Sequence, residues 1–105
     1  MTRALQNFRT YGLAVQYYRK CKEVNLSPSL KGQLTRATES IVLNLAEGSA
    51  KPSPRDRARY YNISLGSFRE TQAILTLAEQ ETLLQDFDHL GACLYKLARA
   101  PAPGP

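Results

Sequence analysis

The chain has 105 residues, which is enough for one hydrophobic core and too few for two domains of ordinary size. Hydrophobic residues make up 43% of the chain and charged residues 22%, which excludes the disordered class and predicts one folded domain over residues 1–100, followed by a disordered proline-rich tail over 101–105. The net charge of +5 is unevenly distributed along the chain. Residues 1–69 contain 12 Lys/Arg and 4 Asp/Glu (+8), whereas residues 70–105 contain 2 Lys/Arg and 5 Asp/Glu (−3). This asymmetry predicts a polyanionic or acidic partner.

The first two predicted helices cover about residues 10–23 and 28–48. In the first, apolar residues recur at the steps of three and four that are typical of an amphipathic helix, at Phe8, Tyr11, Ala14, Tyr18 and Cys21. The second should begin at Ser27-Pro28, because serine is a good N-cap and proline suits the first helical position. We expect Gly48 to end this helix in the left-handed conformation.

The third predicted helix is the longest, from Pro54 to about Glu81, with Ser53 as its N-cap and Asp56 completing a capping box. It carries two apolar stripes, so it should have two helical neighbours. Gly66 in its middle costs about 1 kcal/mol of helix propensity relative to alanine, and we expect it to permit close packing.

A fourth helix should start at Asp86, after a short connection over residues 82–85, and turn Phe87, Leu90, Leu94 and Leu97 inward. No strand pattern competes with the four helices. Short connections between consecutive helices favour antiparallel neighbours. The predicted fold is therefore all-α, an antiparallel up-down-up-down four-helix bundle.

A polar strip follows one face of the second helix, since its members are three or four residues apart. The strip consists of Arg36, Ser40, Asn44 and Glu47, and Glu70 on the third helix is a further candidate member. Two interpretations remain open, a ligand or partner site and a hydrogen-bonded polar layer that fixes helix register. We favour the structural layer.

A basic stretch lies immediately downstream, next to Tyr60 and Tyr61. Cations suit a phosphate backbone because they displace counterions, and aromatic faces can stack on exposed bases. The alternative is a solvated helix start whose tyrosines pack inward. The predicted nucleic-acid-binding residues are Lys51, Arg55, Arg57 and Arg59, with Arg19, Lys20 and Lys22 enlarging the surface in an oligomer.

Other kinds of site receive little support from the sequence. His89 and Cys93 share the spacing of two metal ligands, with Cys21 as a conceivable third, but buried reduced thiols are the favoured interpretation, so no metal is predicted. Catalytic motifs are missing and one histidine leaves few general bases, so we expect no enzyme, cofactor or small-molecule substrate. No apolar run is long enough for a membrane span and no signal peptide is evident, so a cytoplasmic protein without membrane contact is expected.

The chain resembles the bacterial four-helix bundle proteins encoded in intervening sequences of 23S rRNA genes. The residues that carry the resemblance are Ser40-Ile41, Asn44, Ala46-Glu47-Gly48, Ser53, Gly66-Ser67 and Glu70, with Phe8-Arg9 and with Gln33, Arg36 and Ala37. The resemblance spans roughly residues 8–99. It departs from the family at Val42, where the family often has proline, and at Asp56, where glutamate is more usual.

This resemblance implies a homo-oligomer, with a pentameric ring favoured. It extends more distantly to the accessory variability determinant proteins of diversity-generating retroelements, which are similar basic bundles that bind a reverse transcriptase and nucleic acid. The leading functional hypothesis is thus a non-enzymatic accessory protein associated with RNA or DNA. The alternatives are an adaptor for another protein, for example a reverse transcriptase, and an oligomeric scaffold with no dedicated ligand.

Overall fold

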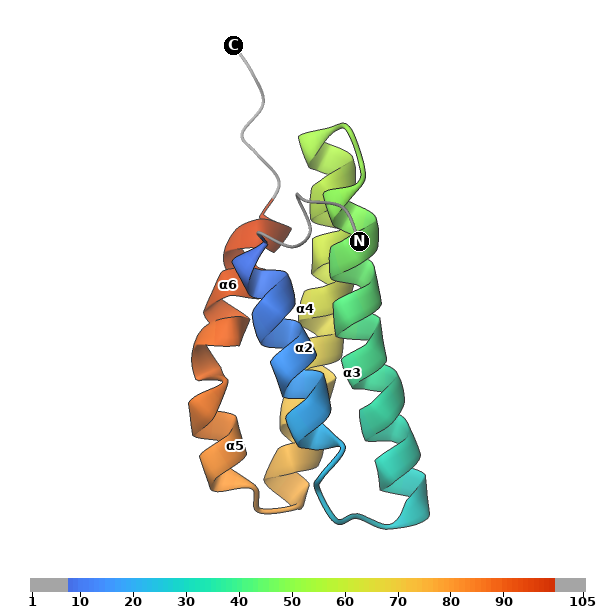
Figure 1. Ribbon diagram of the computed structural model, residues 1–105, viewed down its shortest axis with the longest axis vertical. Coiled ribbons are helices and arrows are strands. Elements are labelled where there is room, and N and C mark those ends of the chain that lie inside the picture. Colours follow the sequence, from blue (N-terminus) through green and yellow to red (C-terminus); the bar gives the residue numbers. More distant parts are fainter. Residues whose placement is uncertain (1–7, 100–105) are drawn as a thin grey trace.

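A computed structural model of the chain describes residues 8–99, which are all-α with five helices and no strand in that range (Figure 1). The helices are α2 (Arg9–Cys21), α3 (Pro28–Ser49), α4 (Pro54–Leu77), α5 (Glu81–Asp86) and α6 (Asp88–Ala98). The predicted tail over 101–105 lies outside the described residues.

The long helices lie side by side, and each runs back along the one before it (Figure 1). α4 packs against α3 on one side and α6 on the other, and α2 contacts the same two helices, so α4 lies diagonally across from α2. The prediction of two neighbours for the third helix is confirmed. We call the end of the molecule where α3 ends and α4 begins the α3–α4 end. It extends beyond the start of α2 and the finish of α6, which lie beside Tyr61 and Asn62 of α4 (Figure 1).

One cluster of buried side chains fills the space between the helices. At its centre the Tyr17 ring lies 5.3 Å from the Phe68 ring and 5.0 Å from the Phe87 ring, measured between centroids. The Tyr17 hydroxyl is also buried, and it shares a 2.7 Å hydrogen bond with Thr71 Oγ1. Because a buried polar group without a partner is costly, this bond lets a tyrosine join α2 to α4 inside an apolar core.

The two predicted serine caps are confirmed. Ser27 Oγ accepts a hydrogen bond from the Leu30 amide at 3.4 Å, and Ser53 Oγ accepts one from the Asp56 amide at 3.0 Å. Each serine is followed by a proline at the first helical position. The starts of α3 and α4 are therefore specified locally, by residues that satisfy backbone groups without help from the core.

The predicted helix stop at Gly48 is wrong. α3 continues to Ser49, and its C-cap Ala50 has right-handed helical dihedrals. Gly48 is buried, and a Cβ placed on it would lie 2.8 Å from the Tyr61 ring and 3.0 Å from the Tyr60 Cβ. Its missing side chain lets α3 and α4 approach each other closely.

Gly66 was expected to permit such an approach, and this prediction is also wrong. A Cβ placed on Gly66 would have no atom within 4 Å, so the residue faces open space. Gly91 is a close-packing position as well as Gly48, because its Cβ would lie 2.8 Å from the Phe68 ring. The chain thus uses glycine for close packing at α3 and α6, and not at the middle of α4.

The third and fourth helices also differ from their predicted bounds. α4 ends at Leu77, where Glu79 takes a positive φ of 57° and reverses the chain. The last segment is already helical from Glu81, and it breaks at Phe87, whose ring enters the core beside Tyr17. Asp86 is therefore the end of α5 and not the cap of a fourth helix.

Candidate nucleic-acid interface

The connection between α3 and α4 is held by one of the predicted binding residues. Arg57, in the first turn and a half of α4, donates from Nη1 to the backbone carbonyls of Lys51 at 3.0 Å and Pro52 at 3.1 Å. It is half-buried. Arg57 therefore fixes the shape of the connection, and its guanidinium is largely engaged by the protein itself.

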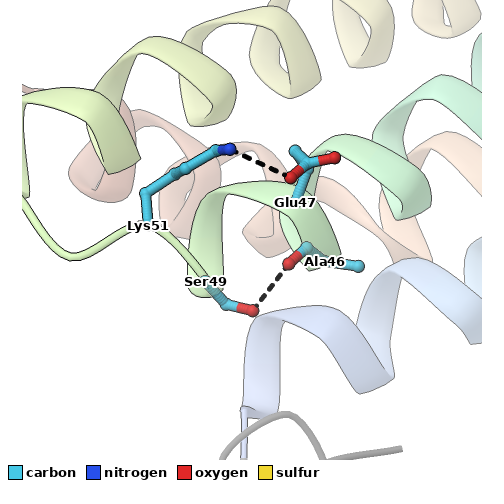
Figure 2. Close-up of polar contacts among 4 residues, drawn as sticks. All are labelled: Ala46, Glu47, Ser49 and Lys51. Atoms are coloured by element: carbon cyan, nitrogen blue, oxygen red, sulfur yellow. Dashed lines mark hydrogen bonds and ion pairs between the residues drawn. The ribbon is translucent and has the colours of Figure 1, made fainter.

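Lys51 is the second predicted residue with an internal partner (Figure 2). Its Nζ lies 3.2 Å from Glu47 Oε2, one helical turn back, and beside it Ser49 Oγ donates to the Ala46 carbonyl at 2.8 Å. The hydrogen bond and the charge of Glu47 raise the pKa of Lys51. A pair this accessible to water is screened by solvent and stabilises the fold little, so a phosphate could replace Glu47 as the partner of Lys51.

Arg55 and Arg59 are the predicted residues that remain exposed. Within residues 8–99 Lys51 and Glu47 form the one ion pair, so neither of these arginines is paired with a carboxylate there. Arg59 Cζ and Lys51 Nζ each lie 5.1 Å from the centroid of the Tyr60 ring. The two arginines are four residues apart and project from the same side of α4.

The two tyrosines have different environments. Tyr61 is buried, and its ring centroid is 6.0 Å from that of Phe8. Burial raises the pKa of Tyr61, although the charge of Arg57 lowers it in part. Tyr60 is half-buried beside the two cations. Tyr61 thus belongs to the core, and Tyr60 belongs to the basic surface.

Two further arginines near this end were not predicted as site residues. Arg9 starts α2, next to Phe8, which packs on Tyr61. Arg99 follows Ala98, whose carbonyl accepts a 2.8 Å hydrogen bond from Asn62 Nδ2 of α4. Both arginines are exposed. Each is isolated in sequence, and only the packing of α2 and α6 beside α4 brings them level with Tyr61 and Asn62.

The other predicted cluster, at Arg19, Lys20 and Lys22, lies at the opposite end of the molecule, because α2 runs away from the α3–α4 end (Figure 1). There Lys20 and Glu23 line a shallow groove of about 470 Å³ with Asp86 of α5. The Lys22 Nζ lies 5.2 Å from the centroid of the Tyr18 ring. A single chain therefore does not join the two basic clusters, and the second is mixed with acidic residues.

The predicted polar strip divides between the surface and the α3–α4 contact. Ser40 Oγ shares a 2.7 Å hydrogen bond with Ser67 Oγ of α4, and Asn44 Nδ2 donates to the Ser40 carbonyl at 2.9 Å. Arg36, Glu47 and Glu70 are exposed. The hydrogen bonds thus unite Ser40 and Asn44 with Ser67, which was not among the predicted members of the layer.

An apolar groove of about 340 Å³ runs between α2 and α3. Val15 and Tyr18 line it from α2, Val42 and Leu43 line it from α3, and Arg19 and Glu39 lie at its rim. Leu43 is 66% exposed and extends the apolar lining of this groove to the surface.

No metal-binding cluster of three or more His, Cys, Asp or Glu side chains is present in the part of the chain that the structure describes. His89 is exposed and Cys93 is half-buried on α6, whereas Cys21 is buried on α2. Burial raises the pKa of the Cys21 thiol to about 12. No helix within residues 8–99 has the length and apolar character needed to cross a membrane.

The sequence model of a protein family described as 23S rRNA-intervening sequence protein matches residues 8–100, nearly the full chain. No curated protein and no solved structure matches the chain.

Proposed function

The chain belongs to the 23S rRNA-intervening sequence protein family, and on that premise we propose that it is a small non-enzymatic accessory protein that associates with nucleic acid through its α3–α4 end. The family is not a known enzyme family. The observation that carries the proposal is the gathering of exposed cations at one end of the molecule. The exposed Arg55 and Arg59 lie there with the half-buried Lys51, and the exposed Arg9 and Arg99 lie farther along α4, level with Tyr61 and Asn62.

Electrostatics would supply most of the binding energy. Each phosphate that meets an arginine or lysine releases condensed counterions, so the affinity should fall steeply as salt rises. The acidic residues near this end, Glu47 and Asp56, are outnumbered. The fold we propose for this role is an antiparallel four-helix bundle in which α5 and α6 form one interrupted fourth helix, and we place the protein in the cytoplasm.

The test is a fluorescence anisotropy titration of labelled RNA and DNA, duplex and single-stranded, at low salt. We expect the double variant Arg55→Gln/Arg59→Gln to weaken binding by at least about 10-fold, since two phosphate contacts are removed. The matched control, Lys20→Gln/Lys22→Gln, makes the same change in net charge at the opposite end, outside the α2–α3 groove, and should change affinity little. Absence of binding by the unaltered protein to every probe would remove the proposal.

We also propose that the protein self-associates, with the pentameric ring implied by the family resemblance as the favoured state. The α2–α3 groove supports this proposal, because an exposed leucine beside an apolar groove loses contact with water when another chain covers it. A contact between two different faces of neighbouring copies closes into a ring when the rotation permits it. Each ring would then present several basic ends to one nucleic acid.

The alternative function is a protein adaptor, for example for a reverse transcriptase, and the same groove is the observation that favours it. A partner held there should survive high salt, since apolar contacts are not screened. Co-purification at high salt separates the two functions. Retention of a defined partner by Arg55→Gln/Arg59→Gln, and its loss in Leu43→Glu, would favour the adaptor.

A further inference from the structure

The outer face of α4 continues the basic surface well beyond the α3–α4 end. Exposed residues recur along it at alternating steps of four and three, which places them on one line of the helix surface. They are Arg55, Arg59, Asn62, Gly66, Arg69 and Ala73. Asp56 lies to one side of this line, whereas Glu70 lies one turn after Gly66, so the face also carries one carboxylate.

This line faces away from the rest of the chain. α4 packs against α3 and α6 and lies diagonally across from α2, so its remaining side is open. Asn62 is held to the end of α6 by its bond to the Ala98 carbonyl, which brings the exposed Arg99 to the border of the same face. Arg55 and Arg69 are fourteen positions apart, which corresponds to roughly 21 Å along the helix axis.

Gly66 lies at the middle of the line and has no function inside the chain. A Cβ there would meet no atom within 4 Å, and the residue has no positive φ that would require glycine. Because Gly66 has no side chain, it leaves the helix backbone accessible to a partner that approaches from outside, as the exposed Gly12 of α2 does. Arg59 and Arg69 outnumber Glu70 around Gly66, so the charge of this face favours a negatively charged partner.

The tyrosines of this surface are poorly disposed to stack on bases. Tyr61 is buried, and Tyr60 already has Lys51 and Arg59 beside its ring. Tyr95, the exposed aromatic side chain of α6, has the Arg99 guanidinium 6.0 Å from its ring centroid. Cations that sit over the rings would have to move before a base could stack, so phosphates are the groups that this surface can contact directly.

We propose that the outer face of α4, from Arg55 to Arg69, binds the phosphate backbone of a nucleic-acid duplex, with the backbone closest to the protein at Gly66. The proposal rests on the nucleic-acid association proposed above and deepens it by naming the ligand as a duplex and by adding Arg69 and Gly66 to the site. The length of the face matches about six base pairs, at about 3.4 Å each.

The experiment uses the full chain and a labelled RNA duplex of about two helical turns, with a DNA duplex and an unstructured single strand of equal phosphate number as further probes. We expect Arg69→Gln to weaken duplex binding about 3- to 10-fold and to reduce the slope of log affinity against log salt by about 0.9. Arg36→Gln, the matched loss of one exposed charge on α3 outside both grooves, should leave both quantities unchanged. RNA and DNA duplexes should both bind more tightly than the single strand.

Gly66→Leu gives a second and independent measurement. Leucine should not destabilise the helix at this open position, but its side chain would hold the backbone away and weaken duplex binding about 10-fold. Two results together would overturn the inference and leave the proposed function standing. Arg69→Gln and Gly66→Leu would both bind the duplex as tightly as the unaltered protein, while Arg55→Gln/Arg59→Gln would still lose affinity. A preference for the single strand would overturn it too, as would a change of oligomeric mass in Gly66→Leu without a change in binding. If the unaltered protein binds no probe, the proposed function itself fails.

Discussion

At the scale of single residues, Gly48 and Gly66 have the same chemistry and opposite surroundings. Gly48 is buried where α3 crosses α4, and Gly66 is exposed on the far side of α4. A sequence pattern can locate a glycine in a helix, but it cannot tell which side of the helix the neighbouring chain occupies. For this reason Gly48 has the close-packing role that was predicted for Gly66, whereas Gly66 has no close neighbour in the described chain.

We predict that Gly48→Val lowers the free energy of unfolding by about 2 kcal/mol. Its Cβ would lie 2.8 Å from the Tyr61 ring and 3.0 Å from the Tyr60 Cβ, which is attached to the helix backbone and cannot turn aside. Urea denaturation followed by circular dichroism measures the change. Gly66→Val is the matched control and should gain less than about 0.5 kcal/mol, because it improves helix propensity in open space. Equal effects at the two positions would contradict the packing assignment.

The buried thiol of Cys21 predicts a dependence of stability on alkaline pH. Burial raises its pKa from 9.0 to about 12, so between these values the unfolded chain loses the thiol proton while the folded chain keeps it. The unfolded state binds fewer protons there, and the contribution of Cys21 to stability therefore falls as the pH rises from 9.0 toward 12.

We accordingly expect the stability difference between the unaltered protein and Cys21→Ala to shrink between about pH 8 and about pH 11. Denaturant unfolding at the two pH values measures this difference, and comparison with the variant cancels the titration of groups that do not interact with Cys21, as Tyr17 does. A difference that stays constant with pH would show that the folded thiol ionises as readily as the unfolded one.

At the scale of the helices, starts were easier to predict than ends. Ser27-Pro28 and Ser53-Pro54 begin α3 and α4 as predicted, because the serine hydroxyl and the proline ring act on backbone groups within three residues. The end of α4 at Leu77 has no glycine or proline to mark it. The turn there is made by Glu79, a residue type that rarely adopts a positive φ.

The turn after α4 has the hydrogen bonds of a Schellman motif. The Gln80 amide donates to the Leu75 carbonyl at 2.9 Å, and the Glu79 amide donates to the Thr76 carbonyl at 3.1 Å. A residue with a Cβ in the left-handed conformation costs about 1 to 2 kcal/mol of stability. Glycine avoids this cost, but its unfolded chain is more flexible and loses more entropy on folding, so the net stabilisation is smaller.

We therefore predict that Glu79→Gly stabilises the protein by about 0.5 to 1 kcal/mol, seen as a rise in the thermal midpoint. Glu79→Ala is the control, because it removes the same carboxylate and keeps the Cβ. If the alanine variant gains as much as the glycine variant, the effect comes from the lost charge and not from the backbone.

At the scale of the whole molecule, the predicted basic stretch separates into residues with different tasks. The sequence located the stretch from Lys51 to Arg59 because its cations are consecutive, and it could not show that Arg57 holds the connection or that Lys51 meets Glu47. It also did not find Arg9 and Arg99, which are solitary in sequence and reach α4 only through packing, or Arg69, which shares a face of α4 with Arg55 and Arg59. The grouping of Arg19, Lys20 and Lys22 with this surface required an oligomer, since one chain holds the two clusters at opposite ends.

The oligomer is itself open to a direct test at Leu43. This side chain is 66% exposed beside the α2–α3 groove, so a charge there should leave the fold of one chain intact. If copies meet at the groove, Leu43→Glu must bury a carboxylate in the contact, which is strongly unfavourable, and the complex should dissociate. Sedimentation equilibrium should then give a multiple of the chain mass for the unaltered protein and a smaller mass for the variant.

The matched control is Gln33→Glu, a substitution at an exposed position of α3 that does not line the groove, and it should keep the larger mass. Equal masses for Leu43→Glu and the unaltered protein would assign the groove to another partner or to none.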